Sequence, residues 1–232
     1  MAQANVKTTF THADRKIVRC LEELDELFRT GADATVSSGN DGELLLPYFL
    51  TRSHSAFLAG VRIVAGGQVA ESYLLSRGCL EHALYAFFIC DHPERALTWA
   101  KRVDGKVAAR KCRDLFTAGN MKKCLVSKHE KLGVIASHLY DRTIQYGAPP
   151  NASDWLTTTD THNRGGSSQM LAAGTAAWRL AMQTVAQAAA CSIRIFGLLY
   201  GERFQALGVA KRLKRFDEFL MKCGDHGSET GC

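Results

Sequence analysis

Residues 71–90 read ESYLLSRGCLEHALYAFFIC, an apolar run in which Arg77, Glu81 and His82 are the only charged or imidazole side chains after Glu71. At about 3.6 residues per turn, apolar side chains fall on more than one face of a helix here, which is typical of a central helix. Arg77 and Glu81 lie one turn apart, and a buried arginine keeps its charge. The stretch therefore predicts an ion pair enclosed within a bundle of helices.

The composition of the whole chain also favours helices. The chain has 232 residues, of which 46% are hydrophobic and 22% charged, and it contains only four prolines. Alternation of Val, Ile and Thr over strand lengths is hard to find. We therefore expect an all-α, single-domain bundle of about seven or eight helices at residues 11–223, with disordered ends at residues 1–10 and 224–232.

Helical spacing of apolar residues predicts where the other helices lie. The expected ranges are 11–31, 43–65, 93–102, 105–116, 121–146, 171–200 and 202–222. A Gly-Gly pair at residues 66–67 makes the 43–65 helix an antiparallel neighbour of the central helix. This hairpin is expected to turn one or more of Arg52, His54 and Ser55 toward the central ion pair.

Residues 152–169, ASDWLTTTDTHNRGGSSQ, form the one long stretch without helical periodicity. A loop of this length in a compact domain is either functional or mobile. It carries His162, Asn163 and Arg164, three side chains able to contact a ligand.

The positive charge of the chain is concentrated in one segment. The formal net charge is +6, and residues 101–131 alone hold ten Lys or Arg against three acids. Four of these bases, which we take as candidate ligand contacts, fall on the 105–116 helix: Lys106, Arg110, Lys111 and Arg113. Such a patch indicates an anionic partner or is simply a solvated helix face.

The cysteines and the N-terminal residues indicate the cellular compartment in which we expect the protein. Eight cysteines are present without any Cys-x-x-Cys pair, and the first residues have neither a basic start nor an apolar core typical of a signal peptide. We expect a cytoplasmic protein without disulfides. The spacing of Cys112, Cys124, His129 and His138 matches no compact zinc site, so neither a metal nor a cofactor is expected.

An Ala-rich stretch at residues 171–200 predicts a long helix. Its small residues permit close helix approach, either within the bundle or across a homodimer. Polar residues recur along it, which argues against a membrane span: Arg179, Gln183, Gln187 and Arg194.

Common enzyme motifs are absent from the sequence. There is no Walker loop, no Gly-x-Gly-x-x-Gly after a strand, no Gly-x-Ser-x-Gly and no His-Glu-x-x-His. Arg77 and His82 are separated by four residues. An arginine stabilises a pentavalent phosphate and a histidine exchanges protons near neutral pH, so this pair suits metal-independent RNA cleavage.

The helical hairpin with LLSRGCLEHALYAFF and the later stretch HLYDRTIQYGAPPN resemble the HEPN-like superfamily of small helical bundles. Arg77 and Glu81 match the Arg-x-x-x-Glu of its second core helix. Four residues match the superfamily's downstream stretch of Tyr, Arg, a polar run and His-Pro-Asn: Tyr140, Arg142, Pro149 and Asn151. The resemblance covers roughly residues 45–200 and implies a HEPN-like core of antiparallel helices.

One departure from that pattern bears on activity. Gly147-Ala148 stands where the catalytic histidine of the superfamily would be, so the ribonuclease pair is incomplete at its usual place. His82 has the right spacing from Arg77 but lies in the earlier hairpin, where a packed core histidine is the alternative interpretation.

Two functional hypotheses follow. The first is a non-catalytic, homodimeric binding module without a membrane role, which engages RNA or a nucleotide-like anion through the basic segment or through a cleft with His54 and Arg142. The second is a ribonuclease of the toxin or phage-defence type, with an atypical site at Arg77, Glu81 and His82 that can also include His54 or Arg142. For Arg77 and Glu81, a structural ion pair is the alternative to catalysis.

Overall fold

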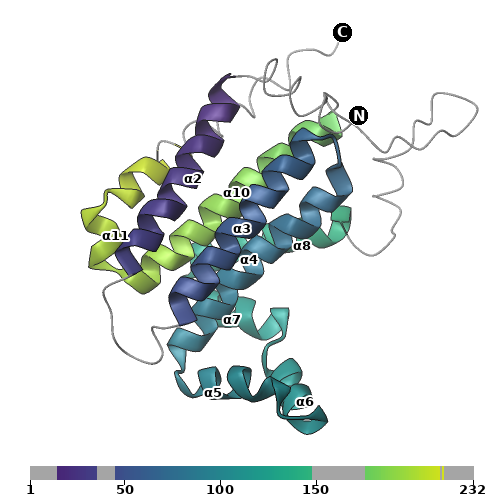
Figure 1. Cartoon of the computed structure of the whole chain (residues 1–232), viewed down its shortest axis with the longest axis vertical. Helices are drawn as coiled ribbons and strands as arrows, with labels where there is room; N and C mark the ends of the chain where they lie inside the picture. The colour runs from purple at the N-terminus through teal and green to yellow at the C-terminus, as the bar shows by residue number, and fades with distance from the viewer. Residues whose placement is uncertain (1–14, 36–44, 148–175, 215, 217–232) are drawn as a thin grey trace, which may run out of the picture.

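The computed structural model describes residues 15–35, 45–147, 176–214 and 216 (Figure 1). Besides the helical residues 209–214, there are ten helices within these residues, eight of them with seven residues or more, and no strand. The expected all-α bundle is therefore confirmed. The expected disordered ends and the 152–169 segment with His162, Asn163 and Arg164 lie outside the described residues.

A hairpin of two long helices forms the centre of the bundle. Helix α3 (Leu45–Ala65) runs into α4 (Val69–Asp91) through a turn in which Gly67 has φ +90°. A positive φ of this size favours glycine, which explains the Gly-Gly pair at the turn. Helix α4 packs against α3, α7 (Ala118–Lys128), α8 (Glu130–Gly147) and α10 (Ala176–Tyr200). This position explains why α4 is apolar on more than one face.

Small residues let α3, α4 and α10 approach closely. Five alanines of α10 are buried in the bundle: Ala181, Ala186, Ala188, Ala189 and Ala190. The hydroxyls of Ser53 on α3 and Ser192 on α10 both donate to the Cys79 carbonyl of α4, at 2.9 and 3.2 Å. The small side chains of α10 therefore serve packing within the chain.

Helix α10 is the one helix of the described part long and apolar enough, by length and composition, to cross a membrane. Of its most apolar window, 67% is buried inside the fold. The core helix of a soluble protein has the same character, so the expectation of no membrane role stays a prediction.

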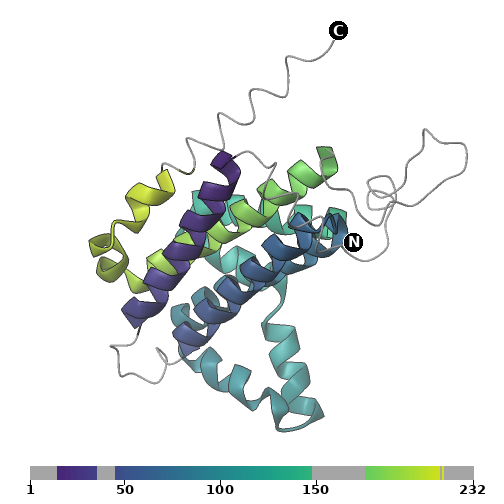
Figure 2. The same ribbon diagram turned by 45° about the horizontal axis from the view of Figure 1, so that its top comes forward.

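A smaller group of helices projects from one end of the bundle (Figures 1 and 2). We call residues 94–116 the arm: α5 (Glu94–Ala100), the 3-10 turn Lys101–Val103 and α6 (Lys106–Leu115). Only Cys112 is buried within these three elements. The principal helical neighbours of α6 are the other two parts of the arm.

The Asp91 carboxylate, at the end of α4, anchors the arm. Its oxygens lie 3.5 Å from the Arg95 guanidinium and 3.4 Å from the Lys128 amine, and accept a hydrogen bond from the Cys124 thiol. Arg95 also donates to the Phe88 carbonyl at 2.8 Å. These contacts join the ends of α4, α5 and α7.

Three expected helix boundaries were wrong. Helix α2 (Arg15–Thr35) continues past Gly31, where the missing Cβ leaves room for the Phe204 ring. The single helix expected at 121–146 is broken at His129 into α7 and α8, because the chain folds back there and Gly133 packs on the Val126 backbone.

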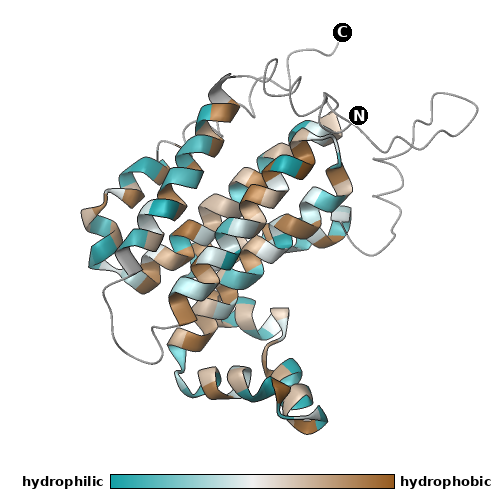
Figure 3. Cartoon of the chain, in the orientation of Figure 1, coloured by the Kyte–Doolittle hydropathy of each residue, from teal (hydrophilic) through white to brown (hydrophobic). Residues whose placement is uncertain are grey.

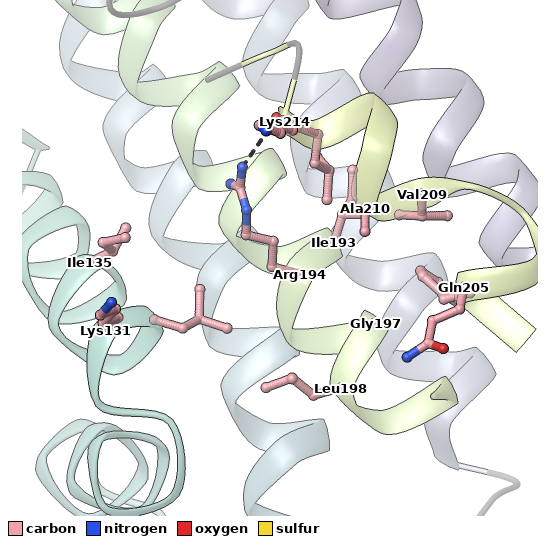
Figure 4. Close-up of a pocket in the computed structure, with 13 residues that line it drawn as sticks. Lys131, Ile135, Ile193, Arg194, Gly197, Leu198, Gln205, Val209, Ala210 and Lys214 are labelled. Carbon is pink, nitrogen blue, oxygen red and sulfur yellow. Dashed lines mark hydrogen bonds between the residues drawn. The ribbon is translucent and has the colours of Figure 1, made fainter. Parts of the chain in front are cut away.

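The last expected helix, 202–222, is also interrupted. Helix α11 (Glu202–Ala206) ends before Gly208, whose φ of +65° breaks the helical backbone before residues 209–214 resume it. The turn folds residues 209–214 back over α10, beside a pocket of about 470 Å³ between α8 and α10 (Figure 4).

Candidate functional site

The Arg77 and Glu81 side chains contact each other, but the pair is not enclosed as expected. Nε of Arg77 lies 3.7 Å from Oε1 of Glu81, and their side chains are 31% and 36% exposed. The same carboxylate oxygen accepts a hydrogen bond of 2.7 Å from the hydroxyl of Tyr140 on α8. The expectation of a buried pair was therefore wrong. Helical periodicity places both residues on α4, but it does not show that the face of α4 with these two residues reaches the surface beside α8.

Tyr140 completes this small cluster and was not among the predicted site residues, although it is part of the HLYDRTIQYGAPPN stretch. Burial, and then the hydrogen bond to Glu81, raise the pKa of Tyr140 above its usual value. The hydroxyl therefore stays protonated at neutral pH and keeps donating to Glu81. Lys122 lies 5.0 Å from the centre of the Tyr140 ring and 2.7 Å from Asp141.

His82 lies on a different face of α4 from Arg77, since five residues correspond to about 140° around a helix. Its ring centre is 6.3 Å from that of Phe49 on α3. Burial, and then the charge of Arg52, lower the pKa of His82 to about 4. The imidazole is therefore largely neutral at pH 7.

The predicted ligand residues His54 and Arg142 each have partners of their own. Nε2 of His54 lies 2.6 Å from Oδ1 of Asp25 on α2, and its ring stacks on Phe28. Arg142 donates to the Gln187 side chain of α10 at 2.7 Å. Asp25 and Gln187 are distant in sequence from these partners, and no local motif pointed to them.

Gly147, where the predicted resemblance expects a histidine, lies against α4. A Cβ at this position would overlap with the Cβ of Tyr73 and would lie 3.2 Å from the Ala70 carbonyl oxygen. The close approach of the two backbones leaves no room for a side chain here. Ala148, Pro149 and Asn151 lie outside the described residues.

The four predicted basic contacts lie together on α6 of the arm. Lys106, Arg110, Lys111 and Arg113 are all exposed. Arg110 lies 3.6 Å from Asp114 in a largely solvated ion pair. The arm also exposes apolar side chains at Leu97 (61%), Val103 (81%) and Val107 (85%), and Figure 3 shows hydrophobic and hydrophilic residues mixed over α6.

Within the described ranges, no group of three or more His, Cys, Asp or Glu side chains is arranged to hold a metal ion. Comparisons with protein-family models, curated proteins and solved structures found no match for this chain. The resemblance to the HEPN-like superfamily therefore stays a prediction.

Proposed function

We propose that the chain is a non-catalytic binding protein whose arm engages RNA through its basic residues. The observation that carries the proposal is that Lys106, Arg110, Lys111 and Arg113 are all exposed on a helix with a single buried residue. Exposed side chains of this kind can reach phosphates and neutralise them, and the solvated pair of Arg110 with Asp114 holds Arg110 only weakly. Each phosphate contact releases counterions, so such binding weakens as salt rises.

The geometry of α4 supports binding without catalysis. Glu81 accepts a hydrogen bond from Tyr140 and pairs with Arg77, and both contacts are made by the same oxygen, Oε1. His82 is neutral at pH 7, and its ring lies toward Phe49 on α3. Arg142 contacts Gln187 of α10, and His54 contacts Asp25 of α2. The predicted site residues are therefore engaged in separate contacts.

Two variants of equal charge test the proposal. The arm variant replaces Lys106, Arg110, Lys111 and Arg113 with Gln. The control variant replaces four exposed bases outside the arm with Gln: Arg62, Arg179, Arg203 and Lys211. Affinity for a short, labelled, single-stranded RNA is measured at about 0.1 M salt.

The arm variant is expected to bind RNA roughly tenfold more weakly than wild type, and the control variant much less so. Equal loss in both variants, or no binding by wild type, would contradict the proposal. Stronger binding to anionic lipid vesicles than to RNA would do so too, because Val103 and Val107 are also suited to a lipid surface. Cleavage of the RNA by wild type but not by His82→Ala would favour the ribonuclease alternative.

A homodimer and a cytoplasmic location belong to the same proposal. The buried alanines of α10 are used within the chain, so they offer no dimer surface. Sedimentation analysis at several concentrations checks the dimer, and a monomer throughout would remove it from the proposal.

A further inference from the structure

An aromatic patch lies where the arm joins the bundle, at the first turn of α3 (Figure 1). The Tyr48 ring centre is 5.9 Å from that of Trp99 on α5, and both rings contact the Phe49 ring, each at 5.3 Å between centres. Phe49 is buried, whereas Tyr48 is 44% exposed. The patch is therefore anchored in the core on one side and open to solvent on the other.

The two ring neighbours of Tyr48 in the described part of the chain are not parallel to it. The planes of Tyr48 and Phe49 are 70° apart, and those of Tyr48 and Trp99 are 53° apart. Edge-on and tilted contacts of this kind hold an aromatic ring in position. The exposed part of the Tyr48 ring is thus a fixed, flat surface on which another planar ring can stack.

Positive charge borders the aromatic patch. The guanidinium carbon of Arg102 lies 4.5 Å from the centre of the Trp99 ring. Arg102 is exposed and belongs to the 3-10 turn of the arm, which packs against α6 and its four basic side chains. On the bundle side, Arg52 is exposed on α3 one turn after Tyr48. The patch is therefore continuous with the basic surface of the arm.

We propose that Tyr48 stacks a base of single-stranded RNA whose phosphates lie along the basic residues of the arm. This inference rests on the proposed function and names the form of RNA that the arm binds. An exposed ring reaches the flat face of a base only where that base has left its own stack, as in single strands and loops. In a duplex the bases stack on one another, and the arm would meet only phosphates, sugars and groove edges.

The same patch is unsuited to a cationic ligand. Aromatic cages hold an ammonium group against ring faces. Here the Arg102 guanidinium already lies over the Trp99 ring, and Arg52 adds a charge of the same sign nearby. Because like charges repel, a flat, neutral base on an anionic backbone is the ligand chemistry that fits both the rings and the charges.

Two variants of the full chain and two RNA probes test the stacking. Tyr48→Ala removes the ring and Tyr48→Phe keeps it. The probes are a single strand of about 16 nucleotides without self-complementarity and an abasic strand of the same length. For the strand with bases, Tyr48→Ala should bind roughly tenfold more weakly than wild type and Tyr48→Phe, because alanine abolishes base stacking. All three proteins should bind the abasic strand alike.

The abasic strand makes the loss specific to the bases. Equal affinity of Tyr48→Ala and wild type for the strand with bases would overturn the proposal. A loss by Tyr48→Ala that is the same on both strands would overturn it too, because the ring would then act without a base. Tyr48 is exposed, so both variants are expected to fold.

Wild type alone gives a second test that needs no variant. Its affinity for the strand with bases is compared with its affinity for the same strand annealed to its complement, at equal salt. A duplex has the higher charge density, so binding through phosphates alone favours the duplex. Base stacking on Tyr48 predicts several-fold tighter binding of the single strand. Equal or tighter binding of the duplex would reject the inference.

The salt dependence separates this inference from the proposed function. Tyr48→Ala removes no charge, so the slope of log affinity against log salt should stay that of wild type, while the arm variant gives a shallower slope. A shallower slope in the arm variant, with unchanged affinity in Tyr48→Ala, would reject stacking and leave RNA binding through the arm intact. Wild-type binding by the arm variant would reject the proposed function and this inference together.

Discussion

The Tyr140 hydroxyl donates a 2.7 Å hydrogen bond to the Glu81 carboxylate, which joins α8 to α4 across 59 positions of sequence. The Arg77 guanidinium contacts the same oxygen from 3.7 Å, and its side chain is 31% exposed. Exposed ion pairs contribute little to stability, whereas a hydrogen bond from a buried group to a charged one contributes more. Glu81 is therefore held mainly by Tyr140.

Tyr140→Phe should reduce the free energy of unfolding by about 1–2 kcal/mol, because it removes a hydrogen bond to a carboxylate and changes little else. Arg77→Ala should cost less than about 1 kcal/mol, since the pair is partly solvated. Urea denaturation of both variants gives the comparison. A larger loss for Arg77→Ala than for Tyr140→Phe would show that the ion pair holds Glu81.

Gly147→Ala should lower the free energy of unfolding by roughly 1–3 kcal/mol, because the added methyl group meets the Tyr73 Cβ. Gly119→Ala is the matched control. A Cβ at this helical glycine has its nearest neighbour at 3.9 Å, so the higher helix propensity of alanine should stabilise the protein slightly. Similar effects at the two positions would mean that α4 and α8 do not approach as described.

His82 should make the protein less stable as the pH falls. Its pKa is about 4 in the folded chain, below the usual 6.5, so the unfolded chain takes up the proton first. The neutral imidazole stabilises the folded chain fully above pH 6.5. This stabilisation is lost as the pH falls from 6.5 toward 4. Relative to His82→Leu, wild type should lose roughly 1–3 kcal/mol over that interval. Parallel pH profiles of unfolding for the two proteins would contradict this.

Asp91→Asn should loosen the arm and cost about 1–3 kcal/mol at neutral pH, since the carboxylate is only 14% exposed and pairs with Arg95 and Lys128. Burial alone raises the pKa of Asp91, but the hydrogen bonds from Cys124 and Lys128 outweigh it and lower the pKa below 3.8. Ionised Asp91 therefore stabilises the folded chain fully above pH 3.8. This stabilisation is lost as the pH falls through the lowered pKa of Asp91.

Hydrogen exchange of α5 and chemical denaturation measure the effect of Asp91→Asn. Glu94→Gln is the matched control, because the Glu94 side chain is 72% exposed and its pair with His92 is solvated. If both substitutions change exchange in α5 equally, Asp91 is not the anchor of the arm.

The central hairpin could be predicted from sequence because local features specify it. The apolar faces of residues 71–90 required a buried helix, and the glycines at 66–67 required a turn. The exposure of Arg77 and Glu81 could not be predicted in this way, because it depends on where α8 crosses α4. The break at His129 was missed for a similar reason, since the apolar spacing of 121–146 continues across it and only the packing of Gly133 on Val126 shows the chain folding back.

The candidate site was predictable only where it depended on composition. The basic character of residues 101–131 is visible in the sequence, and α6 does expose Lys106, Arg110, Lys111 and Arg113. The separate partners of His54 and Arg142 are long-range contacts with Asp25 and Gln187, which no periodicity reveals. The pocket between α8, α10 and residues 204–214 likewise arises from three segments that meet only in the folded chain.

RNA affinity across a salt series tests the central claim most directly. The logarithm of the affinity should fall linearly with the logarithm of salt concentration, by about 0.7 per phosphate contact for a single strand. Removal of the four charges on α6 should make that slope shallower by up to about 3, and removal of four bases elsewhere should leave it nearly unchanged. A wild-type affinity that does not respond to salt, or the same slope in the arm variant, would contradict RNA binding through the arm.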